Sequence, residues 1–351
     1  MGTSTLRQSN FELLRIASMF MIIFYHLVFF IVAPANPDTP FWHSFQLALH
    51  IGVILFVLVS GYFGIKASTK GFVRLILLGF VYYVPLALVD NLILKDGLSG
   101  VEKWKLVIPS FQFLSKGPYW FLRTYLWLYL LSPMVNKFID GSHRNKMYLL
   151  IVTGVISLYV GYNGVDNSVT VGKNIINFFF LYSLGSVLRD TYESWSKWST
   201  LRIAVAFLIL NIALVVLHLH YTGTWFGNTL WKFAYPYNCP ILIVNSVLAF
   251  FLFGKMNFQS RAVNWVASST FATYLIHRNQ VVIERVLKPA TLRIDSGPWS
   301  ICGEILLLLL LSVAIFAVCI LIDKLLNKPL SRIQSAISGW CDRKISLWFN
   351  A

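Results

Sequence analysis

Residues 13–27, "LLRIASMFMIIFYHL", form an apolar run that nevertheless carries an arginine, Arg15, and a histidine, His26. The run lies within a longer apolar stretch at residues 11–33, and about 20 such residues cross a hydrocarbon core of about 30 Å as an α-helix. Similar stretches recur along the chain, of which 57% is hydrophobic and only 12% charged. Ordinary soluble domains contain about 25% charged residues. The sequence therefore predicts an all-α polytopic membrane protein without a soluble domain.

The positions of the apolar stretches predict ten transmembrane helices. Their approximate bounds are residues 11–33, 44–65, 71–94, 118–139, 146–162, 173–190, 200–220, 237–254, 264–285 and 299–323. With the N-terminus in the cytoplasm, the predicted cytoplasmic loops hold almost twice as many Lys and Arg residues as the outer loops. Because basic loops tend to stay on the cytoplasmic side, we expect both termini to be cytoplasmic.

The formal net charge of +15 reflects membrane topology rather than nucleic-acid binding, because the basic residues sit in short loops between apolar stretches. The four cysteines are scattered without a CxxC pair or a His/Cys cluster, so we expect neither a metal site nor a disulfide framework. We expect residues 1–323 to form one transmembrane domain. Residues 324–351 mix aromatic with basic residues, which predicts a basic amphipathic cytoplasmic tail against anionic lipid.

Arg15 and His26 are candidate functional residues because ionisable groups within membrane spans usually face a cavity. Their spacing of 11 residues places them about 20° apart around the helix and about 16 Å apart along it. They share a face but do not touch, so we expect different tasks for them. Two simpler interpretations stay open: Arg15 extends from a helix end to the interface, and His26 bonds a backbone carbonyl in the core.

Depth along the predicted helices sorts the other polar residues into two layers. Ser60 and Gly61 fall level with Arg15, near three basic residues: Lys66, Lys70 and Arg74. The alternative for Ser60 and Gly61 is close helix packing, as small residues allow in membranes.

The deeper layer lies near the level of His26. It contains His50, Arg123 and His277, drawn from three further spans. These residues form a polar chamber if their helices are neighbours. Arg123 is the hardest to explain otherwise, because a mid-span arginine costs at least about 2.5 kcal/mol unless it is paired or hydrated.

Four segments resemble the acyltransferase-3 family of multispan membrane enzymes that O-acylate bacterial surface carbohydrates. The family's hallmark arginine and histidine correspond to "RIASMFMIIFYH", residues 15–26. Its Phe-rich Ser-Gly segment, its Trp-Phe-Leu span and its late Tyr-Leu-Ile-His segment correspond to residues 52–65, 119–136 and 268–277. The similarity covers residues 11–285. Glu12 matches the acidic residue that members commonly carry before the arginine.

The resemblance implies a membrane-bound O-acyltransferase of the bacterial inner membrane. Its donor would be cytoplasmic acyl-CoA, usually acetyl-CoA, and its acceptor a hydroxyl of a cell-surface or lipid-linked carbohydrate. No metal is implied. Larger relatives append an extracytoplasmic hydrolase-like domain, which we do not find in this chain, so a homodimer or a separate extracytoplasmic partner stays open. A carbohydrate or lipid transporter or flippase is the main alternative, and an N-acyltransferase or succinyl-transferring relative is another.

The resemblance also suggests roles for individual residues. Arg15 would hold the phosphates of CoA, because guanidinium groups bind phosphate strongly. His26 would deprotonate the acceptor hydroxyl or be transiently acylated, and the sequence does not choose between these. Arg123 or a neutral His277 would stabilise the thioester oxyanion. The further candidates for binding acyl-CoA or substrate are Ser60, Gly61, Lys66, Lys70, Arg74, Trp120 and His50.

Overall fold

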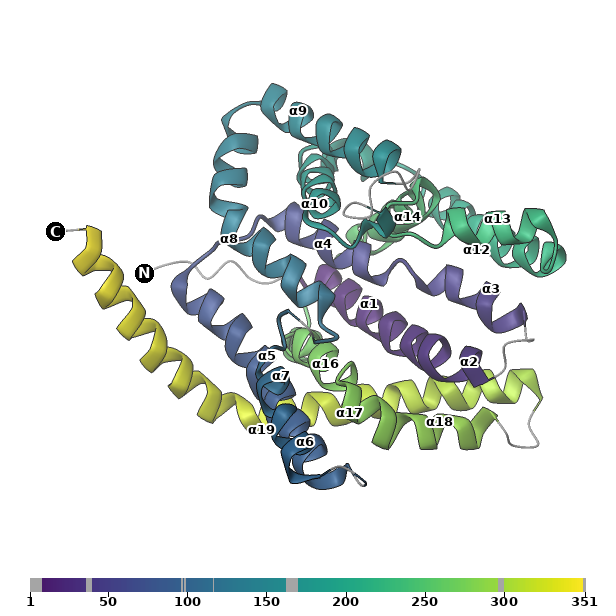
Figure 1. The fold of residues 1–351 in the computed structure, drawn as a ribbon. Coiled ribbons are helices and arrows are strands. Elements are labelled where there is room, and N and C mark those ends of the chain that lie inside the picture. Colours follow the sequence, from purple (N-terminus) through teal and green to yellow (C-terminus); the bar gives the residue numbers. More distant parts are fainter. Residues whose placement is uncertain are drawn as a thin grey trace.

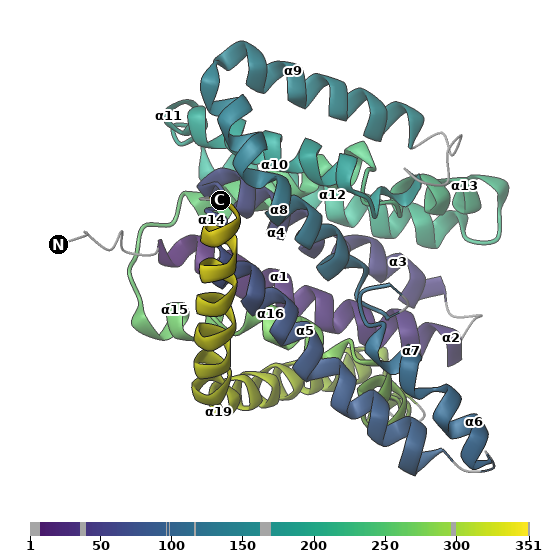
Figure 2. The ribbon, with the colours of Figure 1, turned by 60° about the vertical axis from the view of Figure 1, so that its left-hand side comes forward.

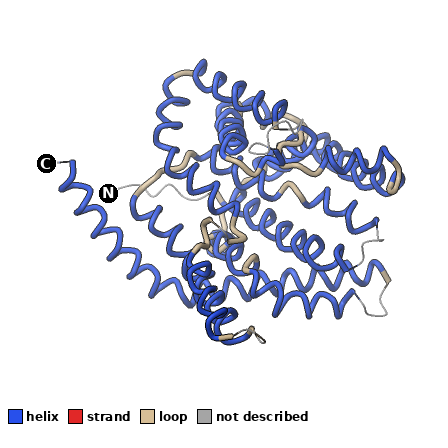
Figure 3. Tube along the Cα trace, viewed as in Figure 1, coloured by secondary structure: helices blue, strands red, loops and turns tan. Residues whose placement is uncertain are grey.

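The computed structural model describes residues 8–35, 40–95, 97, 99–115, 117–161, 170–295 and 300–349. Within these ranges every regular element is a helix (Figure 3). The α-helices are α1 (Ser9–Leu27), α2 (Ala33–Ala35), α3 (Pro40–Leu49), α4 (Gly52–Phe63), α5 (Thr69–Val89), α6 (Gly100–Lys105), α7 (Val107–Phe111), α8 (Trp120–Gly141), α9 (His143–Gly154), α10 (Ile175–Asp190), α11 (Tyr192–Trp195), α12 (Thr200–Tyr221), α13 (Trp225–Ala234), α14 (Pro240–Gly254), α15 (Arg261–Ala267), α16 (Thr270–His277), α17 (Gln280–Val282), α18 (Lys288–Asp295) and α19 (Ile301–Phe349).

Shorter helical turns complete the architecture. Four are π-helical and one is a 3₁₀ turn: Val28–Val32, Asp90–Leu94, Val155–Val160, Ile283–Leu287 and Thr170–Gly172. The first π-helical turn continues α1 one residue after Leu27, close to His26. Such turns often occur next to functional sites.

The all-helical prediction is confirmed, and the helices are apolar enough for a membrane protein. Five segments of the described chain are long and apolar enough to cross a bilayer: Ser9–Ala35, Pro40–Phe63, Thr69–Leu94, Thr200–Tyr221 and Ile301–Lys344. Each of the ten predicted spans contains helix. Their number as true spans, and the cytoplasmic position of both termini, stay predictions.

The segment that carries Arg15 and His26 runs through the middle of the molecule (Figure 1). Helix α1 packs against α4 and α14 on one side and against α15, α16 and α19 on the other. Figure 2 shows the same order from a second direction. Of the apolar windows, 78% of that in Pro40–Phe63 is buried but only 11% of that in Thr200–Tyr221. Helices α1, α3 and α4 thus form the interior, whereas α12 exposes an apolar surface suited to lipid.

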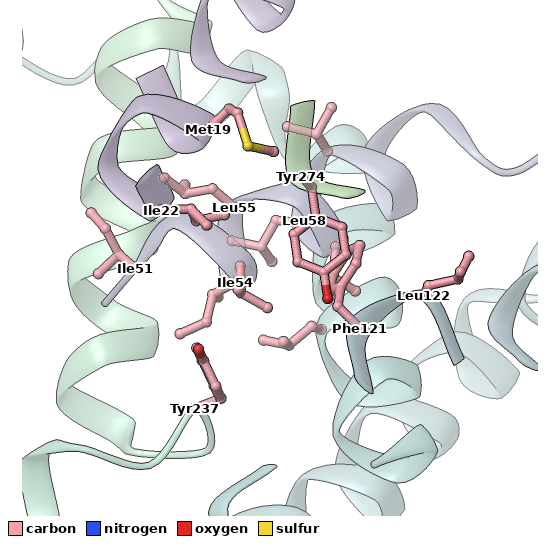
Figure 4. Close-up of a cluster of buried hydrophobic side chains, with 14 of the residues drawn as sticks. Met19, Ile22, Ile51, Ile54, Leu55, Leu58, Phe121, Leu122, Tyr237 and Tyr274 are labelled. Carbon is pink, nitrogen blue, oxygen red and sulfur yellow. The ribbon is translucent and has the colours of Figure 1, made fainter. Parts of the chain in front are cut away.

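Apolar side chains hold α1 against α4. Met19 and Ile22 of α1 lie beside Ile54 and Leu55 of α4 in the close-up of Figure 4, and all four are buried. Fully burying one such side chain contributes about 1.5–3 kcal/mol relative to leaving it in water. In a bilayer the lipid is equally apolar, so the close fit of these side chains stabilises the contact more than their hydrophobicity does.

Helices α4 and α10 approach each other through two glycines. A Cβ atom on Gly61 would lie 2.0 Å from the carbonyl oxygen of Tyr182, and one on Gly185 would lie 2.2 Å from that of Leu58. Neither position therefore has room for a side chain. Gly61 therefore allows close helix packing, which was the alternative interpretation of the Ser-Gly pair.

The predicted span at residues 264–285 is broken into α15, α16 and α17. Asp323 of α19 anchors the start of α16, because it accepts hydrogen bonds from Ser269 Oγ at 2.7 Å and from Tyr82 OH at 3.0 Å. At the other end of α16, Asn279 donates to the Tyr82 carbonyl at 2.8 Å and caps α17. Broken helices at membrane depth usually border a cavity.

Helix α19 continues beyond the predicted domain boundary at residue 323 to Phe349. It contains Pro329, which removes one backbone hydrogen bond, and the ribbon changes direction in its second half (Figures 1 and 2). Gln334 in this half donates to the Lys70 carbonyl at 2.8 Å. The amphipathic tail is thus part of a long helix that returns to α5, and its contact with lipid stays a prediction.

Candidate active site

Two cavities follow one another along α1. The first, the arginine cavity, has a volume of about 270 Å³, and its charged or hydroxylated lining residues include Glu12, Arg15, Ser60, Arg74 and Asp323. The second, the histidine cavity, is narrower, with a volume of about 30 Å³, and its lining residues include His26, His50, Trp120, Tyr237 and Tyr274. Three aromatic side chains border both cavities: Phe56, Phe121 and Phe271. The two predicted layers therefore correspond to two adjacent cavities separated by phenylalanine rings.

Arg15 is held in place by its own helix. Its Nη1 atom lies 2.5 Å from Glu12 Oε1, one helical turn away, and the Glu12 side chain is only 7% exposed. The guanidinium also lies 6.0 Å from the centre of the Phe63 ring. Glu12 thus neutralises Arg15 within the cavity and orients its remaining N–H donors, which agrees with the acidic residue expected before the arginine.

Of the other residues expected beside Arg15, Ser60 and Arg74 line the arginine cavity. Ser60 Oγ donates to the Phe56 carbonyl at 2.8 Å, so its hydroxyl proton is already engaged. Lys66 and Lys70 are exposed outside the cavity. A lysine side chain at either position is free to bind phosphate only from the solvent side.

His26 forms a hydrogen-bonded pair with His277. The distance from His26 Nδ1 to His277 Nε2 is 2.9 Å, and His277 Nδ1 lies 2.6 Å from the Thr273 carbonyl oxygen. A carbonyl only accepts, so we assign the proton of neutral His277 to Nδ1. His277 Nε2 then accepts from His26 Nδ1. This order leaves the Nε2 lone pair of His26 available for a proton or an acyl group, and His26 lines the cavity.

His50 stands at the junction of α3 and α4 within a group of aromatic rings. Its ring centroid lies 4.9 Å from that of Tyr25, 4.6 Å from Tyr235 and 4.1 Å from Tyr237. Trp120 lines the same cavity. Of the three histidines predicted to form a chamber, His26 and His50 line this cavity and His277 bonds to His26. No group of three side chains suited to a metal ion is found in the described residues.

Arg123 does not join this chamber. Its side chain is exposed on the outer face of α8, where it donates to the carbonyls of Leu114 and Ser115 at 3.2 and 3.0 Å. Phe121 of the same helix lines both cavities. Arg123 follows it by two residues, which turns its side chain by about 200° around the helix, away from the cavities. Depth along a helix therefore gave no indication of the face of α8 on which Arg123 lies. We assign it no role in the proposed reaction.

Two further polar residues of the site, Arg278 and Asp323, were not predicted from the sequence. Arg278 follows His277 directly and places its guanidinium 4.2 Å from the centre of the Phe30 ring. It lies within the predicted span at residues 264–285, so the rule that drew attention to Arg123 applies to it equally. Asp323 sits at the last position of the predicted final span. No pattern in the sequence connects it with Ser269, which lies 54 residues earlier.

An all-helical apolar fold with a hydrogen-bonded histidine pair at one of two adjacent cavities defines a membrane protein with an enzyme-like interior. The chain belongs to the acyltransferase-3 family, because the family model described as "Acyltransferase domain" matches residues 8–324. This confirms the resemblance inferred from the four segments and supports a membrane acyltransferase in general. No curated protein and no solved structure matches the chain.

Proposed function

We propose that the protein is an acyl-CoA-dependent O-acyltransferase of the bacterial inner membrane. It moves an acetyl group from cytoplasmic acetyl-CoA to a hydroxyl of a cell-surface or lipid-linked carbohydrate. The hydrogen-bonded pair of His26 and His277 at the histidine cavity, with Arg15 in the adjacent arginine cavity, is the observation that carries this proposal. The family match supports acyl transfer. The donor and the acceptor are those that the resemblance to the family implies, and the two cavities suit them.

The arginine cavity suits the polyphosphate end of the donor. Arg15 and Arg74 both line it, and guanidinium groups form paired hydrogen bonds with phosphate oxygens. The long, thin pantetheine arm of CoA then passes the rings of Phe56, Phe121 and Phe271 to bring the thioester beside His26. Tyr25 and Tyr274 line the apolar chamber there, which limits the access of water to the thioester.

The chemical step uses the free nitrogen of His26 as a general base. Nε2 takes the proton of the acceptor hydroxyl while the hydroxyl oxygen attacks the thioester carbonyl carbon. The carbon–sulfur bond then breaks, and the CoA thiolate takes the proton from His26. His277 and the Thr273 carbonyl stabilise the transient imidazolium because both accept along the hydrogen-bonded chain. The same geometry also allows an alternative mechanism, in which Nε2 of His26 is transiently acylated.

Reconstituted membranes with labelled acetyl-CoA test this proposal. His26→Ala should reduce acyl transfer about 10²- to 10⁴-fold, which is the usual contribution of a general base. His220→Ala is the matched control, because His220 is exposed at the end of α12. Full activity in His26→Ala would contradict the proposal. Movement of a carbohydrate or lipid without release of CoA would instead indicate a transporter or flippase.

A further inference from the structure

Arg278 places a positive charge next to His26 on the side away from Arg15. Its guanidinium lies 4.2 Å from the Phe30 ring centre, and the rings of Phe30 and His26 are 5.3 Å apart. Phe30 follows His26 by one helical turn, farther from Arg15. Because the donor is proposed to enter from the arginine cavity, Arg278 lies on the side from which the acceptor would approach.

No negative charge of the described chain balances Arg278. Its Nη1 atom is buried and has no hydrogen-bond partner, and none of the ion pairs found among the described residues includes it. Tyr25, Tyr119, Tyr237 and Tyr274 lie close enough to interact with its charge, but a neutral tyrosine hydroxyl does not balance a full positive charge. A buried charge without a partner is strongly destabilising, so this position favours an anionic ligand.

Lys173 adds a second cation at the rim of the histidine cavity. Its Nζ atom lies 5.4 Å from the Trp120 ring and 5.9 Å from the Tyr237 ring, and both rings line the cavity. Arg278 stands beside Phe30, and the ring centre of Phe30 lies 5.3 Å from that of His26, which lines the same cavity. An anion at this end of the histidine cavity would therefore meet two cations.

The packing of α10 shows which end of the molecule Lys173 occupies. An ideal Cβ on Gly64, just after α4, would lie 4.0 Å from Arg189 near the end of α10, and Gly61 touches Tyr182. Helix α10 therefore runs alongside α4 in the same direction. Its beginning, next to Lys173, lies level with the start of α4 and His50, away from Ser60 and the arginine cavity.

We propose that the acceptor carries an anionic group, a carboxylate or a phosphate ester, and that Arg278 and Lys173 bind this group while the reacting hydroxyl faces His26. The inference deepens the proposed function and rests on it. Arginine forms two parallel hydrogen bonds with either kind of anion, which would fix the acceptor's orientation as well as its position. A neutral sugar would leave both cations unbalanced.

Binding of simple probes to the full chain in lipid nanodiscs tests the inference without catalysis. Thermal unfolding is measured with glucose, glucuronic acid and glucose 1-phosphate at matched ionic strength. The Tm should rise with one or both of the anionic sugars and not with glucose. The two anions separate a carboxylate site from a phosphate site.

Variants then assign the effect to residues. Arg278→Gln and Lys173→Gln should each remove most of the Tm shift, and Arg278→Lys should keep part of it because the charge remains. Lys105→Gln is the control, since Lys105 is an exposed cation of α6 and lies outside both cavities. A shift that persists in the double variant R278Q/K173Q would overturn the inference.

Two further outcomes would also overturn it: an equal shift with glucose, or no shift with either anionic sugar in the wild-type protein. If Arg278→Gln slows CoA release while the anion-induced Tm shift is unchanged, the guanidinium stabilises the thioester oxyanion and the inference fails.

Failure of the proposed function would give a different result, because the anionic sugars would still bind while labelled acetyl-CoA is not consumed. Transfer to glucose in preference to glucuronic acid would refute the inference alone.

Discussion

Arg15 and Arg278 lie beside the two cavities and differ in how their charges are balanced. Arg15 forms an ion pair with Glu12 on its own helix, whereas Arg278 has a buried nitrogen without a partner. An arginine that is paired within the chain is oriented before any ligand binds. An arginine without such a partner has its charge balanced only when an anionic ligand binds. The comparison suggests that the arginine cavity is preformed for its ligand and that the histidine cavity gains part of its stability from the molecule it binds.

The largest expected effect concerns the orientation of His26. His277→Ala removes the acceptor for His26 Nδ1, so the proton is no longer confined to that nitrogen and Nε2 loses its free lone pair. We expect acyl transfer at saturating acetyl-CoA to fall about 100-fold or more. The Kd for acetyl-CoA should stay close to the wild-type value, because Arg15 is untouched. An unchanged rate would show that the histidine pair is only a packing contact.

The next effect tests the preformed nature of the arginine cavity. Arg15→Gln should weaken acetyl-CoA binding about 10- to 100-fold, because hydrogen bonds to charged groups contribute about 1.5–3 kcal/mol. Arg15→Lys should weaken it less. Glu12→Gln leaves Arg15 unpaired like Arg278 and should lower thermal stability while donor binding is kept. Isothermal titration with acetyl-CoA checks this order, and equal Kd values for wild type and Arg15→Gln would exclude Arg15 as a donor ligand.

A smaller effect is expected from the helix packing that supports both cavities. Gly61→Ala places a Cβ 2.0 Å from the Tyr182 carbonyl oxygen, so α4 must move away from α10. Overpacking of this kind costs about 1–3 kcal/mol and should lower the Tm. Gly100→Ala is the control, because a Cβ there meets nothing within 4 Å. If Gly61→Ala and Gly100→Ala both unfold at the wild-type temperature, the result would contradict the close contact between α4 and α10.

The smallest effect is expected for Arg123 and tests whether this residue lies on the outer face of α8. Arg123→Gln removes two hydrogen bonds from exposed backbone carbonyls and should change stability by about 1 kcal/mol or less. We expect acyl transfer to stay within about twofold of wild type, because the residue lies outside the histidine cavity. A loss comparable to that of His26→Ala would restore Arg123 as a catalytic residue and contradict the orientation of α8.

Much of the candidate site could be predicted where it depends on a single helix. The spacing of Arg15 and His26 gives their shared face, and the structure places one in each cavity. For Gly61 the residues alone favoured the packing interpretation, and the binding role came only from the resemblance to the family. For Arg123 the sequence did not give the face of α8 on which the residue lies, because the neighbours that decide which face points inward come from other parts of the chain.

Hydropathy and helical period belong to the local chain, so the sequence by itself determined the helical class, the positions of the apolar segments and the two levels of polar residues. Contacts between helices depend on packing among distant segments. Only the tertiary structure paired His26 with His277, 251 residues apart, and broke the predicted span at residues 264–285 around α16. Among the residues that the structure describes, it also placed no counter-ion beside Arg278. The pattern along one helix carries no information about which other helices pack against it and form the site with it.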